Sequence, residues 1–196
     1  MRKFALTFLL ACSTLVAISQ PLKQRDVLEV GVHYIVGINS EGIIELEDGS
    51  QFTAAEGYAY VLYYWDPKDK IIMTPNNDLF ASSQYHMTNL TKNESVRVDI
   101  SRGSNLENAY TYRLIAVNHK KEEITLSNLS GVKSCWKIHH DDFQDLLEHW
   151  KIGNSVIVGK NSDGWASRWF SNDPHILICY YATNFNLYVR ATQIPL

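Results

Sequence analysis

Two segments of this chain follow the same pattern, and this internal repeat limits the possible folds more than any other feature of the sequence. Each segment starts with a Trp, passes through a short polar turn that ends in Asp or Asn, and enters an apolar run. The two segments are residues 65–73 and 150–158. A repeat of this kind indicates that one structural unit was duplicated, and overlooking it would misread the whole fold.

The repeat continues outward from both Trp residues in the same order. Upstream, residues 38–39 and 44–46 match 117–118 and 124–126; downstream, residues 88–90 and 96–98 match 183–185 and 189–191. A chance match of one short segment would not extend in this way. We therefore divide the chain into a first module (20–100), a polar connector (101–109) and a second module (110–196).

Most of each module has the composition of β-strands. Residues 28–34 alternate between apolar and polar side chains, with His33 on the polar face, as in a strand with one buried face. Asp48 and Gly49 predict a hairpin turn, because this pair readily adopts the positive φ angles of tight turns. Four further runs rich in β-branched and aromatic residues are predicted strands: 58–65, 110–117, 176–181 and 187–191.

One helix is predicted, and only in the second module. Phe143, Leu146, Leu147 and Trp150 have the spacing of one apolar helix face. Asp141 followed by Gln144 predicts a capping box at its start, and Gly153 predicts its end. The first module has strand-forming residues at the corresponding place.

These patterns predict a mainly β protein of two tandem small β-barrels, SH3-like or OB-like, with one short helix in the second. A module of about 70 to 85 residues with about five short strands suits such a barrel, because closure leaves no strand edge exposed. Trp65 and Trp150 are expected to fill the two cores, and Asp69 and Asn154 to hold the turns that follow. The alternative fold is a single sandwich built from both copies.

The run Leu46-Glu47-Asp48-Gly49-Ser50-x-Phe52, followed by the segment that begins at Trp65, resembles a group of exported bacterial proteins. These uncharacterised proteins repeat a unit of the form DGS-x-W … W-x-x-GD-x-I-x-I. Here Phe52 replaces the first Trp of the unit, and residues 129–131 stand where the second DGS turn would be. The resemblance implies export and a repeated unit, and it brings no activity or binding residues.

The first 19 residues are typical of a secretory signal peptide. Arg2 and Lys3 precede an apolar run that ends at Ile18, and the small residues Ala17 and Ser19 predict cleavage before Gln20. We expect a periplasmic or secreted protein with no transmembrane span after cleavage. The alternative is a lipoprotein acylated at Cys12, because residues 9–12 resemble a lipobox.

Charge and motifs exclude several classes of function. Removal of Arg2 and Lys3 takes the net charge from −3 to −5, which disfavours binding to nucleic acid. The sequence has no nucleophile elbow and no phosphate-binding glycine loop, and we expect no cofactor. A possible disulfide joins Cys135 and Cys179, since both would remain in an oxidising compartment; buried thiols are the alternative.

Residues 139–142 read His-His-Asp-Asp and are the nearest approach to a metal site. Neighbouring side chains at a strand end point in opposite directions, so we expect no metal there. Cys135 with His139 or His140 is a conceivable nucleophile and base, but its apolar surroundings predict an inert thiol. We therefore assign no catalytic residue.

Trp165, Arg168 and Trp169 follow a Gly-containing turn and are the candidate binding residues. Two indole rings beside a guanidinium can stack against a sugar ring or a peptide, although such rings also fill β cores. The resulting hypothesis is an exported noncatalytic binding or structural protein of the bacterial envelope or secreted fraction. Its partner is a carbohydrate or another envelope protein; a hydrolase of an envelope polymer is the alternative.

Overall fold

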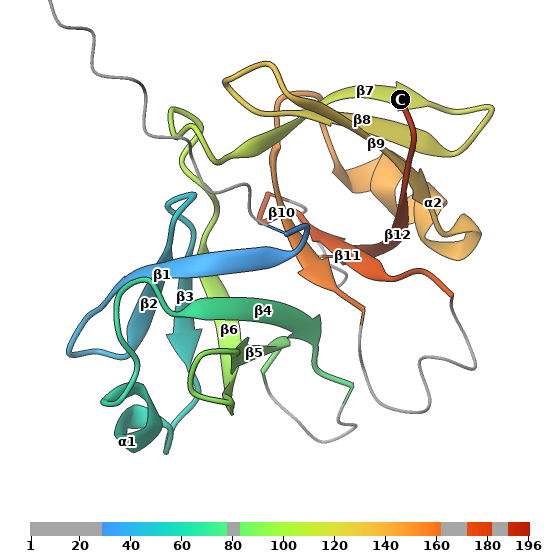
Figure 1. The fold of residues 1–196 in the computed structure, drawn as a ribbon. Helices are drawn as coiled ribbons and strands as arrows, with labels where there is room; N and C mark the ends of the chain where they lie inside the picture. The colour runs from blue at the N-terminus through green and yellow to red at the C-terminus, as the bar shows by residue number, and fades with distance from the viewer. Residues whose placement is uncertain (1–28, 78–82, 162–171, 182–187) are drawn as a thin grey trace, which may run out of the picture.

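The computed structural model describes residues 29–77, 83–161, 172–181 and 188–196. Within these ranges the chain has twelve strands and two helices, arranged as two closed antiparallel barrels that lie side by side (Figure 1). The predicted fold class, two tandem β-barrels, is therefore confirmed, and the single sandwich is not formed.

The two rings have the same topology. The first contains β1 (Val32–Ile38), β2 (Ile43–Leu46), β3 (Gln51–Ala54), α1 (Ala59–Leu62), β4 (Lys70–Pro75), β5 (Tyr85–Asn89) and β6 (Glu94–Arg102). The second contains β7 (Tyr112–Asn118), β8 (Glu123–Ser127), β9 (Lys133–Ile138), α2 (His140–His149), β10 (Ser155–Lys160), β11 (His175–Ile178) and β12 (Tyr188–Ile194). Around the rings the strand orders are β1-β2-β3-β6-β5-β4 and β7-β8-β9-β12-β11-β10, which correspond strand for strand. The internal duplication thus has a direct counterpart in the structure.

The two Trp-led turns occupy equivalent places in the two rings. Trp65 precedes β4 and Trp150 precedes β10, and both indoles are buried. Each turn is closed by a side chain four residues after the Trp. Asp69 accepts a hydrogen bond from the backbone N–H three residues before it at 3.0 Å, and Asn154 does the same at 2.7 Å. The predicted roles of these four residues are confirmed.

The backbone of the two turns is also the same. Lys68 has a φ of 76° and donates its N–H to the carbonyl of Ile35; Gly153 has a φ of 94° and donates to the carbonyl of Leu114. Gly153 therefore belongs to the turn into β10 rather than to the end of α2, which corrects the predicted helix stop.

Strand register confirms most of the matched segments and corrects one. Val96 pairs with Met87 and Val189 pairs with Leu177, so residues 96–98 and 189–191 are equivalent, as predicted. The pairings of β4 with β5 and of β10 with β11 place Ile178 at the position of Thr88. The predicted match of 88–90 with 183–185 is therefore wrong. The reason is that the connection after β11 is longer than the one after β5. Residues 183–185 themselves lie outside the described residues.

Register also identifies the counterpart of Phe52, which the sequence did not reveal. Ile44 pairs with Phe52 and Ile124 pairs with Trp136, so Trp136 is the second-module equivalent. The hairpin from Ile124 to Trp136 spans four residues more than the one from Ile44 to Phe52, and this difference shifts the alignment. The Asp48-Gly49 hairpin is present; of the pair only Gly49 has a positive φ, 81°.

Residues 58–65 do not form the predicted strand. They form α1 and the turn after it, so both modules have a helix between their third and fourth strands. Tyr60, Tyr63 and Tyr64 are exposed while Leu62 and Trp65 are buried. The segment that leads to β4 buries only Leu62 and Trp65 in the core. This tertiary packing outweighs the strand preference of the exposed tyrosines.

The second helix, α2, is confirmed, but its capping differs from the prediction. His139 is the N-cap residue, and its Nδ1 accepts the N–H of Asp141 at 3.3 Å. Asp142 instead accepts two hydrogen bonds from the guanidinium of Arg190 on β12, at 2.6 and 2.9 Å. This charged pair attaches the helix to the barrel wall, while Phe143 and Leu146 are buried beneath it.

Strands β10 and β11 serve both hydrophobic cores. Val158 and Leu177 pack inside the second barrel, whereas Ile157, Ile176 and Ile178 belong to the core cluster of the first. A Cβ added at Gly159 of β10 would lie 2.7 Å from the carbonyl oxygen of Met73 on β4. The two barrels therefore pack closely at β4 and β10, where any larger residue at 159 would separate them.

Replacing Asp69 with Ala is expected to lower the free energy of unfolding by about 2 to 3 kcal/mol, because the fully buried Asn89 amide donates to this carboxylate at 2.8 Å and would lose its partner. Asn154→Ala is the matched variant, and about 1 kcal/mol is expected there, since only the turn bond is lost. Urea unfolding measures both. An equal loss in the two variants would contradict the proposed role of Asn89.

Candidate functional site

The predicted binding residues Trp165, Arg168 and Trp169 lie outside the described residues, so that surface stays a prediction. The described part of the chain contains no helix with the length and apolar character needed to cross a membrane.

Residues 139–142 each have a structural partner. His139 caps α2 and Asp142 binds Arg190, while Nδ1 of His140 lies 2.6 Å from a carboxylate oxygen of Glu122. Across the described ranges, no three His, Cys, Asp or Glu side chains are grouped to hold one metal ion. The cluster thus anchors helix α2 to the second barrel.

Cys135 and Cys179 are thiols in the structure. Cys135 alternates along β9 with the buried Ser134 and Trp136, which places it on the outer face of its strand. Cys179 is buried in the core of the second barrel. The thiols therefore lie on opposite faces of the barrel wall, and the possible disulfide stays a prediction that this arrangement does not favour.

A cleft of about 280 Å³ lies between the two barrels, and both modules contribute to it. The first module supplies the start of β1 and the turn at Glu47 and Asp48. The second supplies β9, β10 and the loop between β8 and β9, and the connecting stretch supplies Ala109 and Tyr110. No single module contains this cleft, so it exists only because the two barrels are packed together.

Equivalent positions of the two modules meet in the cleft. His33 pairs with Ile71 and Tyr112 pairs with Val156, and these pairs occupy corresponding places in the two rings. Both His33 and Tyr112 line the cleft. The duplication has thus brought the same position of each first strand to one site, with a different side chain in each copy.

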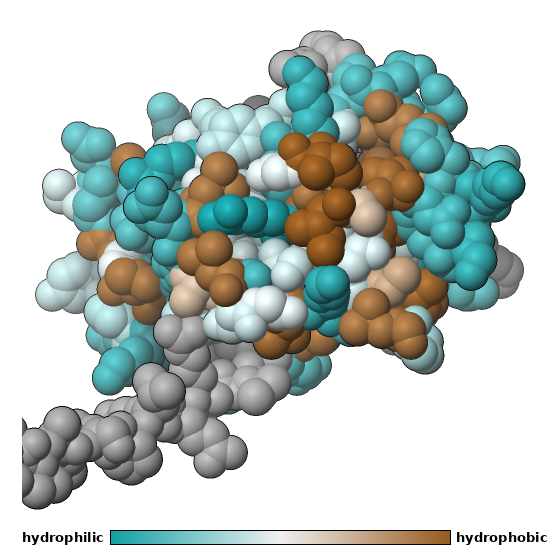
Figure 2. All heavy atoms as spheres, turned by 90° about the horizontal axis from the view of Figure 1, so that it is seen from above, coloured by the Kyte–Doolittle hydropathy of each residue, from teal (hydrophilic) through white to brown (hydrophobic). Residues whose placement is uncertain are grey.

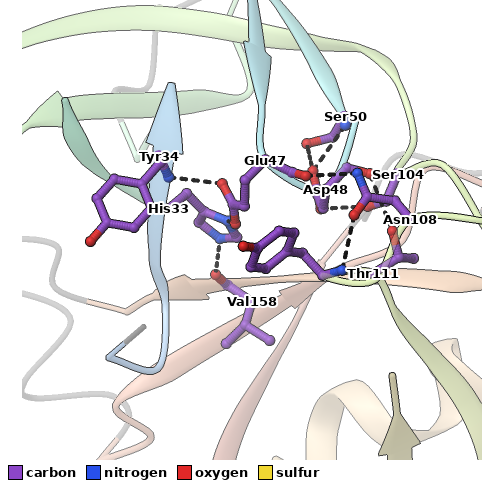
Figure 3. A network of polar contacts seen from close by, with 10 residues as sticks. His33, Tyr34, Glu47, Asp48, Ser50, Ser104, Asn108, Thr111 and Val158 are labelled. Atoms are coloured by element: carbon purple, nitrogen blue, oxygen red, sulfur yellow. Dashed lines mark hydrogen bonds and ion pairs between the residues drawn. The ribbon is translucent and has the colours of Figure 1, made fainter. Parts of the chain in front are cut away.

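A buried ion pair on His33 joins the two barrels at this cleft (Figure 3). Its Nδ1 lies 2.7 Å from a carboxylate oxygen of Glu47, and its Nε2 lies 2.8 Å from the carbonyl oxygen of Val158 on β10. Both neighbours are acceptors, so the ring must carry a proton on each nitrogen to satisfy them. His33 is therefore an imidazolium that bridges the first barrel to the second.

The surroundings stabilise the charges of this pair. Burial lowers the pKa of His33, but the carboxylate of Glu47, its hydrogen bond and the charge of Asp48 outweigh burial and raise the pKa to about 9. Burial alone would raise the pKa of Glu47; the charge of His33 and the N–H of Tyr34, at 2.8 Å, bring it below its ordinary value. The pair is ionised at neutral pH.

The alternation in the sequence predicted an exposed His33, and the structure buries it because that face of β1 meets β10. Sequence reasoning also treated Asp48 only as a turn residue. The available signal was a His at the start of a strand, followed 14 residues later by a turn with two carboxylates.

Asp48 holds the connecting stretch against the first barrel. Its carboxylate is buried and accepts hydrogen bonds from the N–H and the hydroxyl of Ser50 and from the hydroxyl of Ser104 at 2.6 Å (Figure 3). Its carbonyl oxygen accepts from the N–H of Asn105 at 2.9 Å and the hydroxyl of Thr111 at 3.2 Å. The DGS turn therefore fixes the residues that lead into the second barrel.

The connecting stretch runs from residue 103 to residue 111, between the end of β6 at Arg102 and the start of β7 at Tyr112. Besides the contacts of Asp48, the side-chain amide of Asn108 donates to the carbonyl of Glu47 at 2.7 Å. A Cβ at Gly103 would lie 2.9 Å from the Cβ of Tyr180. Bonds and close packing thus hold this segment in place as a wall of the cleft.

The wall formed by the second barrel is mainly apolar. Trp136 is buried, and its indole N–H donates to the hydroxyl of Ser134 at 2.8 Å. Val156 and Val158 continue this wall on β10. Burial raises the pKa of the half-buried Tyr112, which is therefore a neutral phenol at physiological pH.

The exposed part of the lining is mixed: it contains Tyr110 and Val132, and also the polar residues Glu29, Ser130 and Gln193. Figure 2 shows apolar side chains gathered in the middle of the face that carries β7 to β9, with polar side chains around them. Tyr110, Leu129 and Val132 are exposed in this part of the chain. Val132 also lines the cleft, with 56% of its surface exposed.

Comparisons of this chain with known protein families, with curated proteins and with solved structures gave no match. The function is therefore argued from the cleft.

The bridge of His33 makes stability depend on pH in a defined direction. Because folding raises its pKa, the contribution is complete below about pH 6.5 and is lost as the pH rises through about 9. Between pH 6 and pH 10 we expect the wild type to lose about 3 kcal/mol relative to His33→Gln, measured by urea unfolding. If the difference in free energy of unfolding between the two proteins stays the same from pH 6 to pH 10, the bridge is not charged.

Ser104→Ala is expected to destabilise the protein by about 1 to 3 kcal/mol, because it leaves a buried carboxylate oxygen of Asp48 without a donor. Proteolysis within residues 103–111 should become faster. Ser101→Ala is the matched control, since this exposed hydroxyl bonds only to the carbonyl of Gln51 and its loss should change stability by less than about 0.5 kcal/mol. Equal sensitivity of the two variants would argue against a docked connector.

Proposed function

We propose that this protein is an exported, noncatalytic binding protein of the bacterial envelope or secreted fraction, and that it binds a ligand in the cleft between its two barrels. The observation that carries this proposal is the composition of the cleft, which is lined by both modules and by the segment between them. The signal-peptide pattern of residues 1–19 supports export.

The walls of the cleft have the character of a ligand site. Binding sites for small molecules are concave and mainly apolar, with a few polar groups at fixed positions. Here five valines and Trp136 are among the lining residues, and His33 is held rigidly by two bonds. A rigid apolar wall costs little ordering entropy when a ligand binds.

The polar groups of the cleft favour binding over catalysis. His33 and Glu47 have the composition of an acid–base pair, but the Nε2 of His33 donates to the carbonyl of Val158. This nitrogen carries a proton and faces a backbone oxygen, so it is not placed to take a proton from a substrate. The pair instead connects the two walls.

A screen of small neutral and charged fragments, followed by amide NMR shifts, tests the proposal. Fragments should perturb cleft residues such as Val132, Ser134 and Val158, and Val132→Trp should weaken their binding about tenfold or more, because the indole covers the mouth of the cleft. Val36→Trp is the matched control, since Val36 lies on β1 away from the cleft lining and is similarly exposed, at 54%. Binding at other surfaces only, or equal effects of both variants, would refute the proposed site.

A further inference from the structure

We infer that the ligand of the inter-barrel cleft is an uncharged, mainly apolar small molecule that carries a hydrogen-bond acceptor. This inference rests on the proposed function and adds the chemical class of the ligand. Three observations lead to it: the charges at the cleft, its size and walls, and the hydrogen-bonding groups that face it.

Most charged side chains that line the cleft form ion pairs within the protein. His33 and Glu47 neutralise each other at 2.7 Å, and both side chains are at most 10% exposed. At the rim, Glu29 binds the ammonium of Lys160 at 3.0 Å. Within the described residues, the cleft lining therefore contains no cation that is open to an anionic ligand.

A cationic ligand is disfavoured for a related reason. Asp48 is the one lining carboxylate that has no cation within ion-pair distance among the described residues, and it is 3% exposed. Its two oxygens accept three hydrogen bonds, from Ser50 and Ser104. A cation in the cleft would lose its hydration without reaching this carboxylate, and an anion would be repelled by it.

The size and walls of the cleft favour a compact apolar molecule. Its volume, about 280 Å³, is just below the range of about 300–1,000 Å³ that is usual for small-molecule sites. Val30, Val32, Val156 and Val158 line it together with Trp136. The hydroxyl groups of a sugar ring that face these valines would find no partner there, at a cost for each one. The cleft therefore suits an aromatic or alicyclic skeleton.

Polar side chains of the lining include Asn128, Ser130 and Gln193, and two hydroxyl groups lie beside the apolar wall. The hydroxyl of Ser134 accepts the indole N–H of Trp136 and keeps its own proton for a further bond. Tyr112 is a half-buried neutral phenol in the lining. Each group can donate to a ligand oxygen, such as a carbonyl, ether or hydroxyl.

Three probes with one ring system test the inference: 2-naphthol, 2-naphthoate and 2-naphthylmethylammonium, titrated at pH 7 into the purified protein by calorimetry. We expect 2-naphthol to bind about tenfold or more tightly than either charged probe, because only it enters the cleft without an uncompensated charge. Tyr112→Phe and Ser134→Ala should each weaken 2-naphthol about threefold to tenfold while the circular dichroism spectrum stays unchanged. Tyr112→Phe keeps the ring and serves as the test if Ser134→Ala impairs folding.

Val132→Trp and Val36→Trp locate the binding of each probe. Loss of 2-naphthol binding in the first variant and not in the second supports the inference. Tighter binding of a charged probe that Val132→Trp abolishes overturns the ligand class and leaves the proposed function standing. If no probe binds while fragments occupy the cleft, the inferred class is wrong; if fragments also avoid the cleft, the proposed function fails as well.

Discussion

Strand β10 is buried on both of its faces, and this packing sets the arrangement of the two barrels. Val156 and Val158 point into the second barrel, while Ile157 packs into the core of the first. Gly159 has no side chain, which lets the strand approach the carbonyl of Met73. Together with β11, whose Ile176 and Ile178 also pack into the first core, this strand fixes the separation of the two barrels and leaves a cleft where they part.

Polar contacts, in addition to apolar packing, hold the two barrels together. The imidazolium of His33 reaches the carbonyl of Val158 across the contact, and Asp48 holds the stretch that leads into the second barrel. Removing one partner of such a buried group is costly, because the other then lacks a compensating bond. The DGS turn of the first module is therefore more than a hairpin: it fixes one wall of the cleft.

Divergence of the two copies gave the cleft its asymmetry. Equivalent positions carry His33 in the first module and Tyr112 in the second, and Phe52 in the first corresponds to Trp136 in the second. Phe52 fills the core of its own barrel, whereas Trp136 also lines the cleft. The longer loop after β8 extends the rim on the side of the second module. One duplicated scaffold thus presents two different walls to the cleft.

The main features of each barrel could be predicted from the sequence alone: the repeat, the Trp-led turns with Asp69 and Asn154, the Asp-Gly hairpin and helix α2. These features depend on neighbours close in the chain, such as alternation, turn residues and helix spacing, which a linear sequence displays. Three features became visible only in three dimensions. Residues 58–65 form a helix and a turn, and His139 caps α2 in place of Asp141. His33 is buried. The cleft belongs to this second group, because contacts such as the one between His33 and Val158 join residues far apart in the chain, and no local pattern records which face of one barrel meets the other.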